Sequence, residues 1–167
     1  MTKKITVFII LIVMVLLFCL TVFYTDSAAA IPLLDGLRFG STPKQVTRQL
    51  GESFEISHDA AGTGKTVYRY KTAVFGHEAV VTCYFLNNRR LTETSITWNT
   101  NNADLYNQIY TCLYDYYSGN KYFFEEDTQM IDTQSKIFMG LDRGATGLYY
   151  TIISTTEFLT VQCVDNS

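Results

Sequence analysis

The stretch Glu78–Trp98 reads EAVVTCYFLNNRRLTETSITW and decides the fold. Its first half places Ala79, Val81, Cys83 and Phe85 on one side of an extended chain. Val80, Thr82 and Tyr84 lie on the other side, and this period of two is typical of a strand. Asn87-Asn88 is a turn signal, and the alternation resumes in Leu91–Trp98. The sequence therefore predicts a β-hairpin here.

A third strand-like run precedes the hairpin. Thr66–Val74 is rich in β-branched and aromatic residues, and Phe75-Gly76-His77 has the composition of a tight reversal. Together the three runs predict an antiparallel meander.

Two helices flank the meander. Thr42 can cap a helix, Pro43 suits its first position and Gln45 completes a capping box, so a short helix is predicted over Pro43–Leu50 with Gly51 at its end. A second helix begins at Asn101 or Asn102 and stops at Gly119. Its apolar stripe has helical spacing and comprises Leu105, Ile109, Cys112, Leu113 and Tyr116.

The rest of the chain predicts three or four more strands, in Lys121–Glu125, Lys136–Leu141, Gly147–Ser154 and Phe158–Val164. The expected fold class is α+β, with short helices packed on an antiparallel sheet and a helix–three-strand unit occurring about twice. The halves, residues 36–100 and 101–167, have similar content. Neither offers a large core alone, so we expect their sheets to join or pack.

The N-terminus predicts contact with a membrane. Lys3-Lys4 precede an uncharged apolar run from Ile5 to Tyr24, and twenty helical residues span about 30 Å, the thickness of a bilayer core. Basic residues favour the cytoplasmic side, so residues 31–167 are predicted to form an extracytoplasmic domain.

Residues 1–30 can act as a cleaved signal peptide or as a retained anchor. Ala28-Ala29-Ala30 resembles a signal-peptidase site, whereas the length of the apolar run favours an uncut anchor. Both alternatives stay open. Cys19 follows the bulky Phe18, which disfavours a lipid-anchored form.

Charge and cysteine content bound the function. Outside residues 1–30, which hold Lys3, Lys4 and Asp26, the chain has 11 basic and 15 acidic residues and no basic stripe. Nucleic acid is therefore not an expected partner. Three cysteines, Cys83, Cys112 and Cys163, lie in apolar contexts. They are either buried thiols or one disulfide plus a spare thiol.

No catalytic, cofactor or metal motif is evident. Gly62–Thr66 ends in Gly-Lys-Thr, but Asp59 occupies the position where a phosphate loop needs glycine. His58 and His77 lie in no nucleophile motif. The acidic residues Glu125, Glu126, Asp127 and Asp132 match no calcium loop. The sequence thus predicts a protein without enzymatic activity, cofactor or bound metal.

Four tyrosines recur every three or four residues on the second predicted helix: Tyr106, Tyr110, Tyr114 and Tyr117. Tyrosine combines a large apolar ring with a polar tip and is favoured at interfaces. These residues are the candidate binding site, a docking face for a protein or a cell-wall glycan. The alternative is that they flank the core and cover the edge of the sheet.

The segment Gly36–Val46, followed by Leu50-Gly51, resembles the β-lactamase-inhibitor-like group. That group includes small lipoproteins of the outer-membrane assembly machinery and many Firmicute envelope proteins. In its pattern a Gly-hydrophobic-x-x-Gly-x-Ser/Thr loop leads into a short helix that ends in Leu-Gly, and an antiparallel sheet follows. The resemblance implies a tandem helix-and-sheet organisation and protein–protein binding rather than catalysis.

The functional hypothesis is therefore a non-catalytic, exported or membrane-anchored envelope protein that mediates protein–protein interaction. The alternatives are an extracytoplasmic module that binds a small ligand or glycan and an extracytoplasmic hydrolase that uses a histidine.

Overall fold

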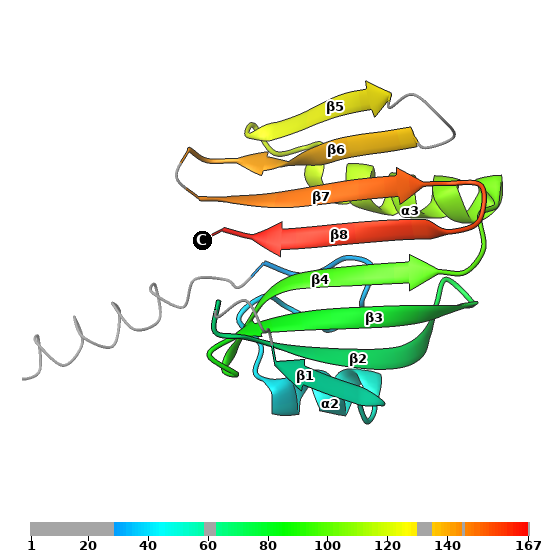
Figure 1. Cartoon of the computed structure of the whole chain (residues 1–167). Helices are drawn as coiled ribbons and strands as arrows, with labels where there is room; N and C mark the ends of the chain where they lie inside the picture. The colour runs from blue at the N-terminus through cyan, green and yellow to red at the C-terminus, as the bar shows by residue number, and fades with distance from the viewer. Residues whose placement is uncertain (1–28, 59–62, 130–134, 145, 167) are drawn as a thin grey trace, which may run out of the picture.

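The computed structural model describes residues 29–58, 63–129, 135–144 and 146–166. The elements in chain order are α2 (Pro43–Leu50), β1 (Glu55–His58), β2 (Lys65–Val74), β3 (His77–Leu86), β4 (Arg90–Trp98), α3 (Ala103–Tyr117), β5 (Phe123–Gln129), β6 (Ser135–Asp142), β7 (Gly147–Ser154) and β8 (Leu159–Asp165). Figure 1 shows one broad sheet with α3 behind β6–β8 and α2 beside β1 and β2.

All eight strands form a single antiparallel sheet in the order β1-β2-β3-β4-β8-β7-β6-β5. Each half of the chain builds four neighbouring strands, and the halves join where β4 pairs with β8, with Ile96 opposite Val161. In Figure 1 this joint lies at the middle of the sheet. The expectation that the two sheets join is confirmed.

The predicted meander is also confirmed. β2 pairs with β3 over ten residues, from Lys65 opposite Leu86 to Val74 opposite His77, and β3 pairs with β4. The tight connections need left-handed backbone, which Phe75, Gly76, Asn87 and Asn88 supply with φ between 51° and 75°. Asparagine and glycine adopt this conformation at low cost.

Both helix starts agree with the sequence. The Thr42 side chain accepts a hydrogen bond from the Gln45 amide, and the Gln45 side chain completes the capping box. Asn102 caps α3 by accepting from the Leu105 amide at 2.7 Å. The buried stripe of α3 differs from the predicted one at its C-terminal end. Tyr117 is buried there, whereas Tyr116 is 57% exposed.

The predicted α+β class, with a helix–three-strand unit occurring twice, is wrong. The described residues hold two helices, of 8 and 15 residues, beside an eight-stranded sheet that dominates the fold. Each helix precedes four strands, not three. The missing strand of the first half, Glu55–His58, has only four residues and a mostly exposed side-chain pattern, so it lacks the apolar alternation by which strands are recognised.

The core lies between the helices and one face of the sheet. Its largest fully buried side chains include Trp98, Tyr70, Tyr150, Phe39 and Phe85. Cys83 and Cys163 are buried within it, Cys112 is half-buried, and all three are free thiols. Burial raises the pKa of Cys83 to about 12, so this thiol serves as a small buried hydrophobe.

Residues 29–40 form a folded segment that packs into the same core. Ala30 bridges to Arg38, the Ile31 amide donates to the Leu37 carbonyl at 3.0 Å, and the Phe39 amide donates to the Ala29 carbonyl at 3.0 Å. Five of its apolar side chains are at most 6% exposed: Ile31, Leu33, Leu34, Leu37 and Phe39. The fold therefore begins at or before Ala29.

The predicted membrane segment, Ile5–Tyr24, lies outside the described residues. Neither α2 nor α3 has the length and apolar content that crossing a bilayer requires.

Candidate functional site: the open face of the sheet

One face of the sheet carries α2 and α3, and no helix of the described residues lies on the other. Tyr70 of β2 contacts Thr47 of α2 through a 3.3 Å hydroxyl–hydroxyl hydrogen bond, and Tyr150 of β7 bonds Tyr117 of α3. Because side chains alternate along strands, the residues between these covered positions point the other way. We call this second surface the open face. Its central members are Tyr84, Thr82, Ser95, Thr97, Thr160, Gln162, Thr151, Tyr149, Phe138 and Phe124.

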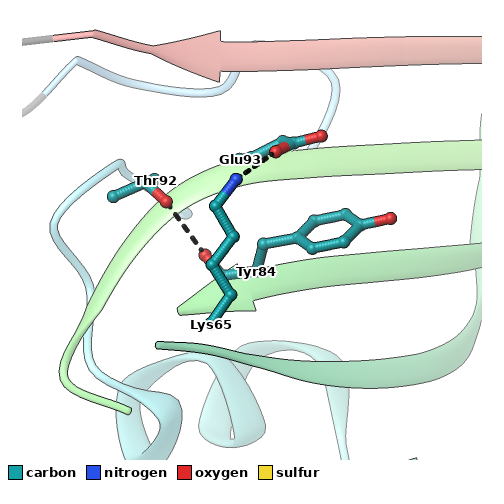
Figure 2. A network of polar contacts seen from close by, with 4 residues as sticks. All are labelled: Lys65, Tyr84, Thr92 and Glu93. Carbon is teal, nitrogen blue, oxygen red and sulfur yellow. Dashed lines mark hydrogen bonds and ion pairs between the residues drawn. The ribbon is translucent and has the colours of Figure 1, made fainter. Parts of the chain in front are cut away.

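A polar network occupies the β2–β4 side of the open face (Figure 2). Lys65 Nζ lies 3.1 Å from Glu93 Oε2 and 5.8 Å from the centroid of the Tyr84 ring. The Thr92 hydroxyl donates to the Tyr84 carbonyl at 3.4 Å. Burial, with Glu93 adding to it, raises the pKa of the Tyr84 hydroxyl. The charges of Lys65 and Glu93 thus compensate each other beside the uncharged Tyr84 ring.

An aromatic cluster occupies the β5–β7 side of the open face. The Phe138 and Tyr149 rings are stacked, with centroids 5.8 Å apart and planes 8° apart, and Phe124 lies 5.5 Å and 6.1 Å from them. Gly140 lies between Phe124 and Tyr149 in the strand register. The three rings are half-buried although no described helix covers them.

The centre of the open face is uncharged. One row across the strands reads Thr82, Ser95, Gln162 and Thr151, and in the next row the Thr97 and Thr160 hydroxyls are 3.1 Å apart. Charged side chains lie toward the margins. Two of the cations are paired with carboxylates of the chain: Arg69 with Glu55, and Lys65 with Glu93.

The tyrosines predicted as a binding site lie on the opposite side, between α3 and the sheet. Tyr117 is 4% exposed, and its hydroxyl donates to the Ala30 carbonyl at 3.1 Å and contacts the Tyr150 hydroxyl. It is a core residue in this structure, so it is unavailable to a partner.

The other three tyrosines brace α3 against the edge strand β5. Tyr110 donates to the Glu125 carboxylate at 3.0 Å and stacks on Tyr114, which meets the Phe123 ring edge-on at 5.5 Å. Tyr106 is half-buried, and burial followed by the charges of Asp127 and Glu125 raises its pKa. The geometry thus favours the alternative in which these rings flank the core and cover the sheet edge.

The Tyr117–Tyr150 pair makes the stability of the domain sensitive to alkali. Burial is the largest cause that raises the pKa of both hydroxyls. Below about pH 10, the ordinary tyrosine pKa, both stay protonated in folded and unfolded chains. Above it the unfolded chain releases protons that the folded chain retains. We expect the free energy of unfolding to fall by up to about 1.4 kcal/mol per pH unit for each tyrosine.

Urea denaturation between pH 8 and 11 measures this slope. Tyr150→Phe should flatten it above pH 10, whereas Tyr116→Phe, which alters an exposed ring, should leave it unchanged. Equal slopes in all three proteins would contradict the assignment.

The histidines do not form a common site. His58 pairs with Thr66 near the start of β2, and His77 pairs with Val74 at its end. Eight residues along a strand correspond to about 27 Å, so the two rings cannot act on one bond. Lys65 of the Gly-Lys-Thr sequence belongs to strand β2 and not to a loop that leads into a helix. Gly62 and Asp132 lie outside the described residues.

Comparison with known proteins leaves the chain without an assigned family. No family model, curated protein or solved structure matches it significantly. The resemblance of the loop at Gly36–Val46 to the β-lactamase-inhibitor-like group therefore stays a prediction.

Sequence reasoning missed the open face because no motif marks it. The sequence signal for this face is the set of strand residues that alternate with the buried ones. These are Val80, Thr82 and Tyr84 of β3, and Ser95 and Thr97 of β4. Apart from Val80, these positions hold hydroxyl or aromatic residues rather than the charges that usually solvate an exposed face. Without the strand order, the sequence could not show that these residues lie beside Gln162 and Thr151 of β8 and β7.

Proposed function

We propose that this chain is a non-catalytic envelope protein, attached to or exported across the membrane by residues 5–24, and that it binds a partner protein through the open face. The observation that carries the proposal is a sheet face that no described helix covers, with a neutral centre and an aromatic cluster on its β5–β7 side. The membrane attachment rests on the N-terminal sequence.

The size of the open face supports a protein partner. Seven inter-strand gaps of about 4.8 Å give a width of about 34 Å, and strands of seven residues are about 23 Å long. The product is about 800 Å², the area that each partner contributes to a standard protein–protein interface. A small ligand would need a concave pocket instead of so broad a surface.

The composition supports the same kind of partner. Interface centres are depleted of charge and enriched in aromatic residues, as are the Thr82–Thr151 row and the cluster of Phe124, Phe138 and Tyr149. Because Lys65 and Arg69 are paired within the chain, the face offers little attraction to polyanions. The expected partner is a folded protein that presents an uncharged, partly apolar surface.

A matched pair of substitutions tests the proposal. Gln162 lies exposed at the centre of the open face, and Gln108 is exposed on α3 on the opposite side. Gln162→Arg places a long charged side chain in the proposed interface, whereas Gln108→Arg makes the same chemical change elsewhere. Both substitutions should lower the free energy of unfolding by less than about 0.5 kcal/mol, as surface substitutions usually do.

The measurement is quantitative co-purification from detergent-solubilised native membranes. A protein recovered with the wild type and with Gln108→Arg, but at least tenfold depleted with Gln162→Arg, is the expected result. Equal recovery with all three chains would exclude the open face. Binding of the wild type to purified cell-wall glycan that Gln162→Arg abolishes would favour the glycan-binding alternative and overturn the proposal.

A further inference from the structure

The chain enters the fold at one particular end of the sheet. Ala29 pairs with Phe39, and the next residue, Gly40, donates to the Leu91 carbonyl near the start of β4 at 2.8 Å. The start of β4 adjoins the β3–β4 turn and the end of β8, where Arg90 lies 3.6 Å from Asp165. We call this the entry end. It also holds the β6–β7 turn and the starts of β2 and β5 (Figure 1).

The connection from the predicted membrane segment to the entry end is short. Residues 25–28 separate Tyr24 from Ala29, and a fully extended chain of that length reaches at most about 18 Å. Because Ala29 is hydrogen-bonded into the fold, it offers no additional slack. The attachment point of the domain therefore stays within that distance of the bilayer whenever residues 5–24 span it.

A cut after Ala30 would undo part of the fold. It would remove the carbonyls that accept from the Phe39 amide and from the Tyr117 hydroxyl. It would also create an ammonium group at Ile31, which is 1% exposed. Burying an unpaired charge is strongly unfavourable, so the structure favours a chain that keeps Ala29 and Ala30.

The entry end is basic although the domain is acidic overall. In the described part of the chain it carries Arg38, Lys65, Arg89, Arg90, Lys121 and Arg143 against Glu93, Asp142 and Asp165. The opposite end has the reverse excess, with Glu78, Asp104, Asp127 and Glu157 against Lys71 and Lys136. The charges are thus polarised along the strands, with the positive side where the chain enters.

Two exposed apolar side chains accompany these cations. Tyr122 is 44% exposed, and its ring lies 4.6 Å from Lys121 Nζ and 6.0 Å from the Arg143 guanidinium carbon. Leu86 is 41% exposed beside the turn that holds Arg89. Tyrosine with lysine or arginine is the combination enriched where proteins meet lipid headgroups.

From the short connection and the polarised charge we infer that the domain stands on the membrane with its entry end against anionic phospholipid headgroups. Arg89 and Leu86 contact the lipid under one half of the sheet, and Tyr122, Lys121 and Arg143 under the other. The strands then run along the membrane normal, and the open face is turned sideways, where a neighbouring envelope protein can reach it. This inference rests on the membrane attachment in the proposed function but not on the partner.

Short-range fluorescence quenching in full-length protein tests the orientation. Single labels at Asn88→Cys, in the β3–β4 turn, and at Thr156→Cys, in the β7–β8 turn, mark the two ends. The background carries Cys19→Ala and Cys112→Ala, since Cys83 and Cys163 are buried. The protein is reconstituted in vesicles of phosphatidylcholine with phosphatidylglycerol, and the quencher is a lipid with a nitroxide on its headgroup.

We expect strong quenching at position 88 and at least fivefold weaker quenching at position 156. Arg89→Glu with Arg143→Glu should reduce the signal at position 88 severalfold, whereas Lys71→Glu with Lys136→Glu, the same change at the opposite end, should not. Equal quenching at both ends, or a chain that fails to associate with the vesicles, would overturn the inference.

Intact mass of the chain purified from membranes supplies a second check. A mature form that begins at Ile31 would also overturn the inference. Loss of the open-face partner with Gln162→Arg is read out separately, so failure of the orientation and failure of the partner proposal can be told apart.

Discussion

Replacing Trp98 with alanine is expected to lower the free energy of unfolding by about 3–5 kcal/mol. Trp98 is fully buried at the end of β4, and its indole Nε1–H donates to the Val74 carbonyl at 3.3 Å. Alanine would leave a large cavity and remove this hydrogen bond. Because domains of this size are stable by only about 5–15 kcal/mol, the variant should be partly unfolded at 37 °C.

Urea denaturation followed by far-ultraviolet circular dichroism measures this loss, because Trp98 is the only tryptophan and its fluorescence disappears with it. Trp98→Phe is the matched control: it fills most of the volume and loses the hydrogen bond, so its cost should be less than half as large. If Trp98→Ala lowered the free energy of unfolding by less than about 1 kcal/mol, the neighbouring side chains would have to move in and fill the cavity.

Gly140→Ala is expected to cost about 3 kcal/mol, the upper part of the range for overpacking a core. A Cβ atom at Gly140 would lie 2.0 Å from the Leu148 carbonyl oxygen and 3.1 Å from the Tyr149 Cα. Both contacts are with backbone of the neighbouring strand, so no side-chain rotation relieves them. The β6–β7 pairing must separate locally, and the ring of Tyr149 must move with it.

The control is Gly119→Ala, where an added Cβ meets nothing within 4 Å. It should change stability by less than about 0.5 kcal/mol. Partner recovery should fall with Gly140→Ala even at temperatures where the chain is folded, since the cluster of Phe124, Phe138 and Tyr149 is displaced. Unchanged stability would mean that the strands can separate at this point without cost.

Local signals predicted most of the elements but not the fold class. The capping box at Thr42, the Asn87-Asn88 turn and the alternation in Glu78–Leu86 are short-range patterns, and each corresponds to an element of the structure. The single strand that lacked such a pattern, Glu55–His58, was missed. That omission contributed to the prediction of helix–three-strand units, when the sheet has four strands from each half.

The candidate site depended on information that the sequence does not hold. The helical spacing of Tyr106, Tyr110, Tyr114 and Tyr117 correctly placed them on one helix, but spacing cannot show which side of a helix meets the sheet. Tyr117 proved to be a core residue because Tyr150, 33 positions later, supplies a partner for its hydroxyl. The open face likewise exists only once β8 has been placed beside β4.

That pairing has a consequence for biogenesis. β8 is a central strand, flanked by β4 and β7, yet among the described strands it is the last to be synthesised. Until it arrives, the nine-residue β4 presents an unpaired edge with Leu91, Ile96 and Trp98 uncovered, the kind of edge that invites aggregation. During synthesis the first half should therefore need a chaperone, and a nascent chain arrested before Leu159 should stay protease-sensitive.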